Sequence, residues 1–345
     1  MADSFNIPVC LIIFKRADTT VKIIEQIAKI KPSKLYLLAD QGRNEEERRL
    51  VSECRKAVEQ AITWPCEVIK YYAEENRGVY ENIAGGAKYV FAREKWAIFL
   101  EDDNYPALSF FEYCRELLKK YENNGEILWI CGTNYLERYQ TPNGESYMFT
   151  KHLLPCGWAS WATKFNKTYD GDLKGLFESN AKEKLRKKYS SKRLYSQQYF
   201  CFRKEQHRKL AGKKYNSWDY QMAFSIRYYD KFGISPSFNQ ITNIGVDGMS
   251  EHGGNSWKKT MTSRFCGVPT HELQFPLHHP SRIAIDSYYE KKIDKIIIND
   301  FATRFKHHLK CIIFKLLGLD DTLTFNEGKS ELKQKLNHDN NKKSE

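Results

Sequence analysis

The first 131 residues alternate short apolar runs with amphipathic helical segments, and this pattern restricts the fold more than any other feature of the chain. The apolar runs are continuous, which is typical of strands that are covered on both faces. Such strands, joined by helices, form a parallel sheet flanked by helices. The sequence therefore predicts an α/β protein with a mostly parallel sheet. The expected strands are 8–14, 34–39, 66–72, 96–100 and 127–131, and the expected helices are 19–30, 45–62, 82–93 and 107–121.

The rest of the chain is less regular. Residues 132–180 carry Gly, Trp and Pro with little clear period, as expected of loops and short elements that face a substrate. Residues 181–215 are strongly basic, and a helix is expected at 220–229. A basic amphipathic helix is expected at 301–319, and the polar residues 328–345 are predicted to be a disordered tail.

Composition excludes several classes of protein. Apolar residues make up 41% and aromatic residues 14% of the 345-residue chain, so a folded protein is expected. The beginning of the sequence has neither the basic nor the apolar region of a secretory signal, and no apolar window reaches the roughly 18 residues that span a membrane. The nine cysteines are scattered without a C-x-x-C pair, which argues against zinc clusters and favours reduced thiols. These features predict a cytoplasmic protein.

Three consecutive acids, Glu101, Asp102 and Asp103, form an acid cluster directly after the expected strand 96–100. Open parallel sheets bind ligands at the carboxyl ends of their strands. Adjacent carboxylates raise one another's pKa unless a cation neutralises them, and Mn²⁺ or Mg²⁺ can do so while bridging to substrate phosphates. An isolated E-D-D is more often a solvated turn. Its place at the end of a buried strand favours a metal-diphosphate site.

The run E-N-R-G at residues 75–78, followed by W-A-I-F-L-E-D-D-N, resembles the nucleotide-sugar domain of the GT-A fold glycosyltransferases. The E-D-D form is similar to that of the N-acetylglucosaminyltransferase I type. The resemblance covers residues 7 to about 255 and is clearest between 70 and 105. It implies a Rossmann-like, mostly parallel GT-A sheet with a C-terminal helical extension, a nucleotide-sugar donor, and Mn²⁺ or Mg²⁺ as cofactor.

The resemblance also implies roles for residues at strand ends. Asp103 matches the direct metal ligand, while Asp102 and Glu101 match residues that hold ribose, sugar and metal-bound water, with Asp102 also beside the metal. The remaining nucleotide-sugar residues match by position: Phe14 and Arg16 for base and ribose, Asp40 with Arg43 for the base, and Asn76, Arg77 and Gly78 along the nucleotide. Asp40 to Arg43 is equally consistent with a simple turn, and Arg77 with a surface position.

The acceptor side is expected around two Trp segments. Gly157, Trp158 and Trp161 form a Gly-Trp segment that provides either a flat wall for a sugar ring or a core Trp pair behind a tight turn. A Trp-Asp context follows in the family, and Trp218 with Asp219 fits it. Asp219 is the candidate catalytic base, which removes a proton from the acceptor hydroxyl in an inverting displacement. An acid there is also consistent with a helix N-cap.

A Gly-rich loop at 243–254 contains one His, and loops of this composition can order over a bound substrate. His252 matches the late residue that reaches the metal or diphosphate in many GT-A enzymes, and Asp247 is a weaker candidate. A surface His in such a loop is the competing interpretation.

The net charge of +12 predicts an anionic partner. Residues 181–215 contain thirteen Lys or Arg, a pattern consistent with nucleic acid, anionic lipid, a lipid-diphosphate-linked acceptor, or an ordinary solvated surface. The helix at 301–319 either lies in a membrane interface or docks its apolar face on the domain. Its charge favours peripheral attachment at the inner face of the cell membrane.

Together these observations predict a metal-dependent glycosyltransferase. It would move a sugar from a nucleoside diphosphate, with UDP as the first candidate, to a glycan or glycolipid hydroxyl in cell-surface polysaccharide synthesis. No nucleic-acid partner is expected. One alternative is a sugar-phosphate nucleotidyltransferase, although the residues after the first strand lack its Gly-rich loop. The other is a non-enzymatic basic protein that binds nucleic acid or membrane. The expected organisation is a nucleotide-sugar half (1–135), an acceptor half (136–280), an amphipathic helical tail (281–327) and a disordered tail (328–345).

Overall fold

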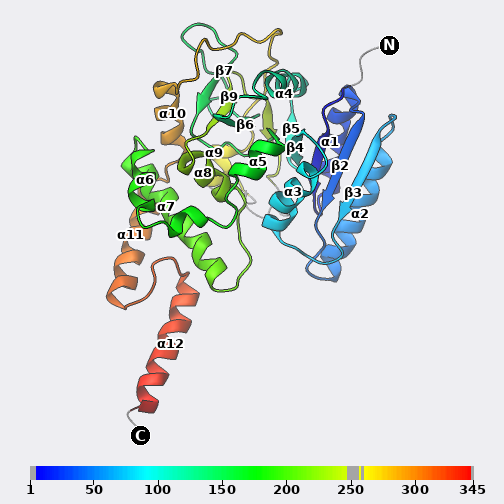
Figure 1. Cartoon of the computed structure of the whole chain (residues 1–345). Coiled ribbons are helices and arrows are strands. Elements are labelled where there is room, and N and C mark those ends of the chain that lie inside the picture. Colours follow the sequence, from blue (N-terminus) through cyan, green and yellow to red (C-terminus); the bar gives the residue numbers. More distant parts are fainter. Residues whose placement is uncertain (1–4, 247–255, 258–259, 343–345) are drawn as a thin grey trace.

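A computed structural model describes residues 5–246, 256–257 and 260–342 (Figure 1). Its centre is an eight-stranded sheet with the order β3-β2-β1-β4-β8-β6-β9-β7, and a two-stranded sheet pairs β10 with β5. The strands are β1 (Val9–Ile13), β2 (Lys34–Ala39), β3 (Glu67–Tyr72), β4 (Trp96–Glu101), β5 (Asn104–Pro106), β6 (Ile127–Cys131), β7 (Tyr147–Thr150), β8 (Trp158–Trp161), β9 (Phe232–Pro236) and β10 (Ile241–Asn243).

The central sheet is mostly parallel, as predicted. Strands β3, β2, β1 and β4 run in one direction, with Val9 of β1 opposite Leu35 of β2 and Ile98 of β4. Strand β8 is antiparallel to β4 and β6, and β7 is antiparallel to β9. The chain runs outward from β1 to β3 and then returns to β4 on the other side of β1. In open sheets this reversal leaves a ligand-binding crevice at the carboxyl ends of the two central strands.

Helices cover both faces of the sheet because alternate strand residues point to opposite sides. In β1, Val9, Leu11 and Ile13 belong to one apolar core, which they share with α1, α2 and α4. Cys10 and Ile12 belong to a second core, which includes α3, α5, α8 and α10. The helices and helical turns up to residue 228 are α1 (Ala17–Ile30), α2 (Glu45–Ala61), η1 (Glu81–Gly85), α3 (Gly86–Phe91), α4 (Ser109–Lys120), α5 (Ala162–Thr168), η2 (Lys174–Phe177), α6 (Ala181–Lys187), α7 (Lys192–Leu210) and α8 (Asp219–Tyr228).

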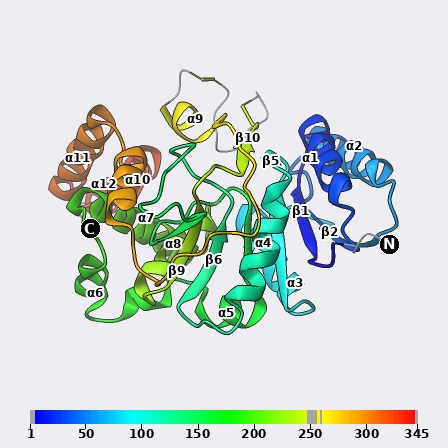
Figure 2. The ribbon, with the colours of Figure 1, turned by 90° about the horizontal axis from the view of Figure 1, so that it is seen from above.

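The chain ends in a helical extension, as the sequence predicts. Figure 2 shows α10 and α11 at the opposite end of the molecule from α1 and α2. The last helices are α9 (Thr260–Phe265), α10 (Ser287–Ile297), α11 (Phe301–Leu316) and α12 (Phe325–Lys342). Within the described part of the chain, no helix combines the length and apolar content needed to cross a membrane.

Helix α12 corrects the prediction of a disordered tail at 328–345, because it continues to Lys342. The first turn of α12 is held by apolar contacts, and most of their residues come before the polar tail in sequence. The ring of Phe325 meets that of Phe314 edge-on with centroids 5.6 Å apart, and Gly328 lies close against the Phe314 ring. Leu319 and Leu323 complete this small core. A polar segment that follows such an anchored first turn, and that is rich in Glu, Lys, Leu and Gln, has the residue types that favour helix.

Candidate functional site

The acid cluster lies where strand β4 ends, beside the carboxyl end of β1. Glu101 is the last residue of β4 and is opposite Ile12 of β1. Asp102 and Asp103 form the turn that leads into β5. Asp102 is buried, with 6% of its surface exposed, and Asp103 is largely covered. The acids therefore lie at the carboxyl end of a central strand, as the sequence predicts, and ligand binding at this edge stays a prediction.

Arg16, which follows β1, brings a positive charge into direct contact with the acid cluster. Its Nη2 atom donates to Oδ1 of Asp102 and, over 2.9 Å, to Oδ2 of Asp103. Burial lowers the pKa of Arg16, but Asp102 and Asp103 outweigh this effect and raise it overall. The Nη1 atom of Arg16 is buried and has no hydrogen-bond partner among the described residues. A buried guanidinium nitrogen without an acceptor is costly, so this atom is suited to an anionic ligand oxygen.

The acid cluster carries more negative charge than Arg16 neutralises. Burial raises the pKa of Asp102 to about 6, although Arg16 opposes the shift. Burial also raises the pKa of Glu101 well above its ordinary value, and Asp103, Asp102 and Asp219 add to the rise. Perturbed carboxyls that share one place are characteristic of functional sites. The cluster is thus destabilised by its own charge, and a further cation would relieve it.

The loop after β10 lies directly against the acid cluster, because β10 pairs with β5 and the pairing sets Asn243 opposite Asn104. The amide of Ile244 donates to the carbonyl of Asp103 over 2.9 Å. A Cβ atom on Gly245 would lie 2.4 Å from Oδ2 of Asp103 and 2.6 Å from Nη1 of Arg16. Only glycine permits this close approach. The described beginning of the Gly-rich loop is therefore part of the site.

Asp40, at the end of β2, organises the segment 76–78. Its Oδ1 accepts hydrogen bonds from the amides of Gln41 (2.8 Å) and Arg77 (2.7 Å). Its Oδ2 accepts from the side chain of Asn76 (3.1 Å) and the amide of Gly78 (2.9 Å). Both oxygens are thus occupied within the protein. The carboxylate of Asp40 thus anchors the three residues of the N-R-G segment, and contacts of these four residues with a nucleotide stay a prediction.

Gly78 and Arg77 have local roles that explain this segment. Gly78 has φ 87°, a left-handed conformation that lets the chain turn into η1. The guanidinium of Arg77 lies over the ring of Tyr71 at 4.4 Å and donates to Oδ1 of Asn82 over 3.3 Å. Lys214, from the loop before α8, donates to the carbonyl of Asn76 over 2.9 Å. The segment therefore joins the first half of the sheet to the basic region.

Phe14 and Arg43 lie close together beyond the ends of β1 and β2. The Arg43 guanidinium is 5.9 Å from the centre of the Phe14 ring. Arg43 is also held by Glu47, which accepts from its backbone amide (3.0 Å) and Nε (2.8 Å). Glu47 also binds Lys15 over 2.8 Å. Hydrogen bonds from Arg43 and Lys15 lower the pKa of Glu47, despite partial burial. The predicted neighbours are thus brought together, with Glu47 as a positioning residue that the sequence interpretation did not identify.

The Trp residues expected to face a sugar lie in the core. Trp158 is 1% exposed and stacks between Phe99 and Trp129, with centroid distances of 3.9 and 4.2 Å. Trp161 is equally buried and donates to the carbonyl of Leu118 over 2.8 Å. Trp218 is 5% exposed and stacks on Trp158. The prediction of an accessible aromatic wall is therefore corrected: Trp158 and Trp218 pack between the sheet and α8, and Trp161 packs on the opposite face of the sheet against α4.

Gly157 has a different role from the adjacent Trp. It has φ 59°, and a Cβ atom there would lie 2.5 Å from the side chain of Ile241. Its amide donates to Oδ1 of Asn104 over 2.8 Å, and Nδ2 of Asn104 donates to Oδ1 of Asp103 over 2.6 Å. Asn104 is 1% exposed. Gly157 therefore supports the acid cluster through Asn104 and does not itself form a sugar surface.

Asp219 lies at the start of α8 and within electrostatic reach of Glu101, whose pKa it raises. The helix does not use it as a cap, since the amide of Tyr220 donates to Oγ of Ser217 over 3.0 Å. The Ser217 hydroxyl in turn donates to Oδ1 of Asp219. Asp219 is half-buried. The fold therefore brings the two acids together although 117 residues separate them. The candidates His252 and Asp247 lie outside the described residues.

The residues of the acid cluster fit a hard divalent cation. Arg16 contacts Oδ1 of Asp102 and Oδ2 of Asp103, and Asn104 donates to Oδ1 of Asp103, so the carboxylates of both Asp residues are held in place at one position. Mg²⁺ is usually held by one or two carboxylates together with substrate phosphates. The unpartnered Nη1 of Arg16 lies next to Gly245, whose backbone approaches Asp103 closely. These groups therefore suit a cation shared with a phosphate.

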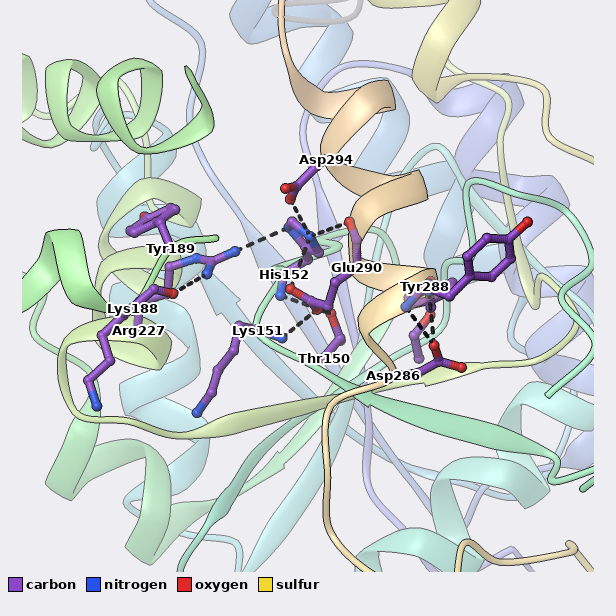
Figure 3. A network of polar contacts seen from close by, with 12 residues as sticks. Thr150, Lys151, His152, Lys188, Tyr189, Arg227, Asp286, Tyr288, Glu290 and Asp294 are labelled. Carbon is purple, nitrogen blue, oxygen red and sulfur yellow. Dashed lines mark hydrogen bonds and ion pairs between the residues drawn. The ribbon is translucent and has the colours of Figure 1, made fainter. Parts of the chain in front are cut away.

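A second group of potential metal ligands, His152, Glu290 and Asp294, is buried between β7, α8 and α10 (Figure 3). Nε2 of His152 is 3.3 Å from Oε2 of Glu290 and 3.1 Å from Oδ1 of Asp294. Its Nδ1 atom faces Nη2 of Arg227 at 3.4 Å. A guanidinium can only donate, so Nδ1 is the acceptor and Nε2 carries the proton. The proton lies where a metal would have to bind, so this group is a hydrogen-bonded link that fixes α10.

Several features of the site were missed in the sequence interpretation. Arg16 was predicted at the site, but its pairing with the acids across the β1–β4 junction was not. Asn104, Asn243 and Gly245 were not singled out, although Asn104 directly follows E-D-D and Gly245 lies in the Gly-rich loop. Burial raises the pKa of Cys156 well above its ordinary value, and Asp103 and Glu101 raise it further. The Cys156 thiol therefore lies beside the acid cluster. Its place there follows from the strand order β4-β8-β6, which the sequence does not reveal.

Comparisons with known proteins give little further guidance. No protein-family model matches the chain, and no curated protein matches it. Among solved structures, a UDP-glucose pyrophosphorylase complexed with UDP-glucose is similar over 69% of this chain and 94% of its own, with 11% identity and a TM-score of 0.35. The bifunctional glycosyltransferase WbbM is similar over 66% of this chain, with 14% identity and a TM-score of 0.28, and this chain spans 38% of its length. Similarity at this level supports no conclusion about the reaction.

Proposed function

We propose that this chain is a metal-dependent glycosyltransferase that uses a nucleoside diphosphate sugar, with UDP as the first nucleotide to test. One observation carries the proposal. A buried, charge-strained acid cluster stands at the carboxyl ends of β1 and β4, and Arg16 presents an unpartnered Nη1 atom beside it. A site with both features can bind a cation and a diphosphate together.

The donor half of the reaction would depend on residues around the acid cluster. Asp103 and Asp102 would hold Mn²⁺ or Mg²⁺, which when bound stabilises negative charge on a diphosphate leaving group. Arg16 would keep one hydrogen bond to these acids and offer Nη1 to a phosphate oxygen. Gly245 would keep the loop close enough to exclude water from the diphosphate. Phe14 and Arg43, which lie side by side, would contact the base.

The acceptor half would depend on Asp219. The Ser217 hydroxyl holds one carboxylate oxygen of Asp219, which leaves the other oxygen to take the proton of an acceptor hydroxyl. A base on the side of the donor opposite the leaving group produces inversion, so we propose an inverting transfer. The proposed acceptor is a glycan or glycolipid hydroxyl in cell-surface polysaccharide synthesis. We further propose that the protein works at the inner face of the cell membrane, without a nucleic-acid partner.

Donor binding can be tested by thermal unfolding of the full chain with Mn²⁺ and with UDP, GDP or dTDP. A ligand at a hundred times its dissociation constant stabilises the folded state by about 2.7 kcal/mol. We expect such a shift with one nucleotide plus metal, and a much smaller one in Asp103→Asn. A wild-type protein that none of the three nucleotides stabilises would refute the proposed function.

The reaction itself can be tested with the responsive nucleotide, using a panel of its sugars and measuring slow hydrolysis. Asp219→Asn should lower turnover by about 10²–10⁴-fold while donor affinity stays within about twofold. Glu183→Gln is a matched control, because this exposed acid on α6 pairs with Lys187 in the i,i+4 manner. If sugar phosphate and nucleoside triphosphate gave a sugar nucleotide and pyrophosphate, the enzyme would instead be a nucleotidyltransferase.

A further inference from the structure

Helix α11 presents an apolar face to solvent. The sequence interpretation left open whether this face docks on the domain, and the structure shows that it does not. The six apolar side chains of the α11 stripe are 39–81% exposed. They recur at helical spacing and cover one side of the helix. The α11 stripe consists of Phe301, Phe305, Leu309, Ile312, Ile313 and Leu316.

The opposite face of α11 makes the contacts with the rest of the chain. Phe314 is the one fully buried residue of the helix, at 3% exposure. The ring of His307 packs edge-on against Phe200 of α7, with centroids 4.2 Å apart. Lys310 donates to the carbonyl of Asp321 over 2.9 Å and lies 5.6 Å from the Phe200 ring centre. The helix is therefore held by its less apolar side, so its position in the fold does not depend on covering the stripe.

Positive charge borders the stripe on both sides. Helix α11 contains no Asp or Glu, and its cap Asp300 is the nearest acid in sequence. By helical spacing, Arg304 and Lys315 flank one edge of the stripe, and Lys306 flanks the other. In the described part of the chain, no salt bridge joins these three cations to an acid. The net charge of +12 reinforces this local charge.

We propose that the α11 stripe binds the surface of an anionic lipid bilayer, with the helix lying in the plane of the interface. A broad apolar face with basic borders is the pattern of interfacial helices. A 16-residue helix is about 24 Å long, which is too short to cross a hydrocarbon core of about 30 Å. A second copy of the chain is a poorer occupant, because pairing two stripes would bring like-charged borders together. The inference does not depend on the proposed reaction.

Vesicle co-sedimentation of the full chain tests the proposal. Wild-type protein should bind vesicles of phosphatidylcholine with phosphatidylglycerol, and should bind pure phosphatidylcholine vesicles at least about tenfold more weakly. Phe305→Ser with Leu309→Ser should weaken binding about a hundredfold, since each lost side chain is worth about tenfold. The matched control is Phe177→Ser with Leu210→Ser, which removes the same two residue types from exposed positions outside α11 and should leave binding unchanged.

The border charges are tested separately. Lys306→Glu with Lys315→Glu should weaken binding to the anionic vesicles by at least about twentyfold, because each basic residue near such a surface contributes about fivefold. Circular dichroism should show that every variant keeps the wild-type fold, since all six positions are exposed.

Three outcomes would overturn the proposal. The stripe variant could bind the anionic vesicles as well as wild type does. The charge variant could bind them unchanged. Light scattering could show a wild-type dimer that the stripe substitutions dissociate, without vesicle binding by either protein, and the stripe would then be an interface between copies. Nucleotide-induced stabilisation is measured on the same proteins, so failure of lipid binding is distinguished from failure of the proposed reaction.

Discussion

Replacing Asp102 by Asn should stabilise the ligand-free protein at neutral pH. The folded structure raises the pKa of Asp102 from 3.8 to about 6, chiefly by burial. An acid whose pKa is higher in the folded state binds its proton more tightly there. The contribution of Asp102 to stability therefore falls as pH rises from about 4 to 6. A metal ion and diphosphate would restore that stability in the functional state.

The magnitude follows from the pKa shift. A rise from 3.8 to about 6 is 2.2 pH units, which at about 1.36 kcal/mol per unit amounts to about 3 kcal/mol. Asn has nearly the same shape and can still accept the hydrogen bond from Arg16, but it carries no charge. The stability difference between Asp102→Asn and wild type should therefore be near zero at pH 4 and reach up to about 3 kcal/mol above pH 6.

Urea unfolding of both proteins between pH 4 and pH 7.5 measures this difference, and subtraction cancels the titration of all other groups. Glu183→Gln is the control. Because Lys187 lowers the pKa of this exposed acid, the stability difference between Glu183→Gln and wild type should change little with pH and in the opposite direction. The reasoning is refuted if Asp102→Asn is less stable than wild type at pH 7 by more than about 1 kcal/mol. That result would mean that the carboxylate stabilises the fold without any ligand.

Three further substitutions test other parts of the structure. Gly245→Ala places a Cβ atom 2.4 Å from Asp103 and should weaken nucleotide binding at least about tenfold in calorimetric titration, with little change in unfolding midpoint. Gly78→Ala should cost about 1–2 kcal/mol in urea unfolding because φ is 87°, whereas Gly125→Ala, which meets no atom within 4 Å, should cost less than about 0.5 kcal/mol. Glu290→Gln should lower the free energy of unfolding by about 2 kcal/mol, since Oε1 of Glu290 accepts from Thr150 and the Lys151 amide and Oε2 faces His152. A loss of stability below about 0.5 kcal/mol would show that this group does not hold α10.

The central strands were predictable because both faces of the sheet are covered. Continuous apolar runs at 34–39 and 127–131 match β2 and β6 residue for residue. Each of these strands contributes side chains to two cores, so nearly every position must be apolar. Strands β7 and β8 have four residues each and were not predicted. A four-residue strand is too short for its apolar pattern to differ from that of a loop.

The sequence predicted the site only for those residues that lie at the ends of strands. The acid cluster follows β4 directly, and Asp40 follows β2, so strand-end position alone located them. The pairing of Arg16 with Asp102 spans 86 positions and depends on β1 lying beside β4. The Trp residues were misplaced because the aromatic type does not reveal whether a ring faces solvent. Trp158 is a core residue because β8, which contains it, lies between β4 and β6 in the sheet.

The most direct test of the account is a titration of the protein with Mn²⁺ in the presence of UDP, in which electron paramagnetic resonance measures free Mn²⁺. We predict that wild-type protein binds Mn²⁺, that Asp103→Asn loses this binding, and that His152→Asn retains it. Binding that persists in Asp103→Asn and disappears in His152→Asn would place the metal beside α10 and contradict the assignment of the acid cluster.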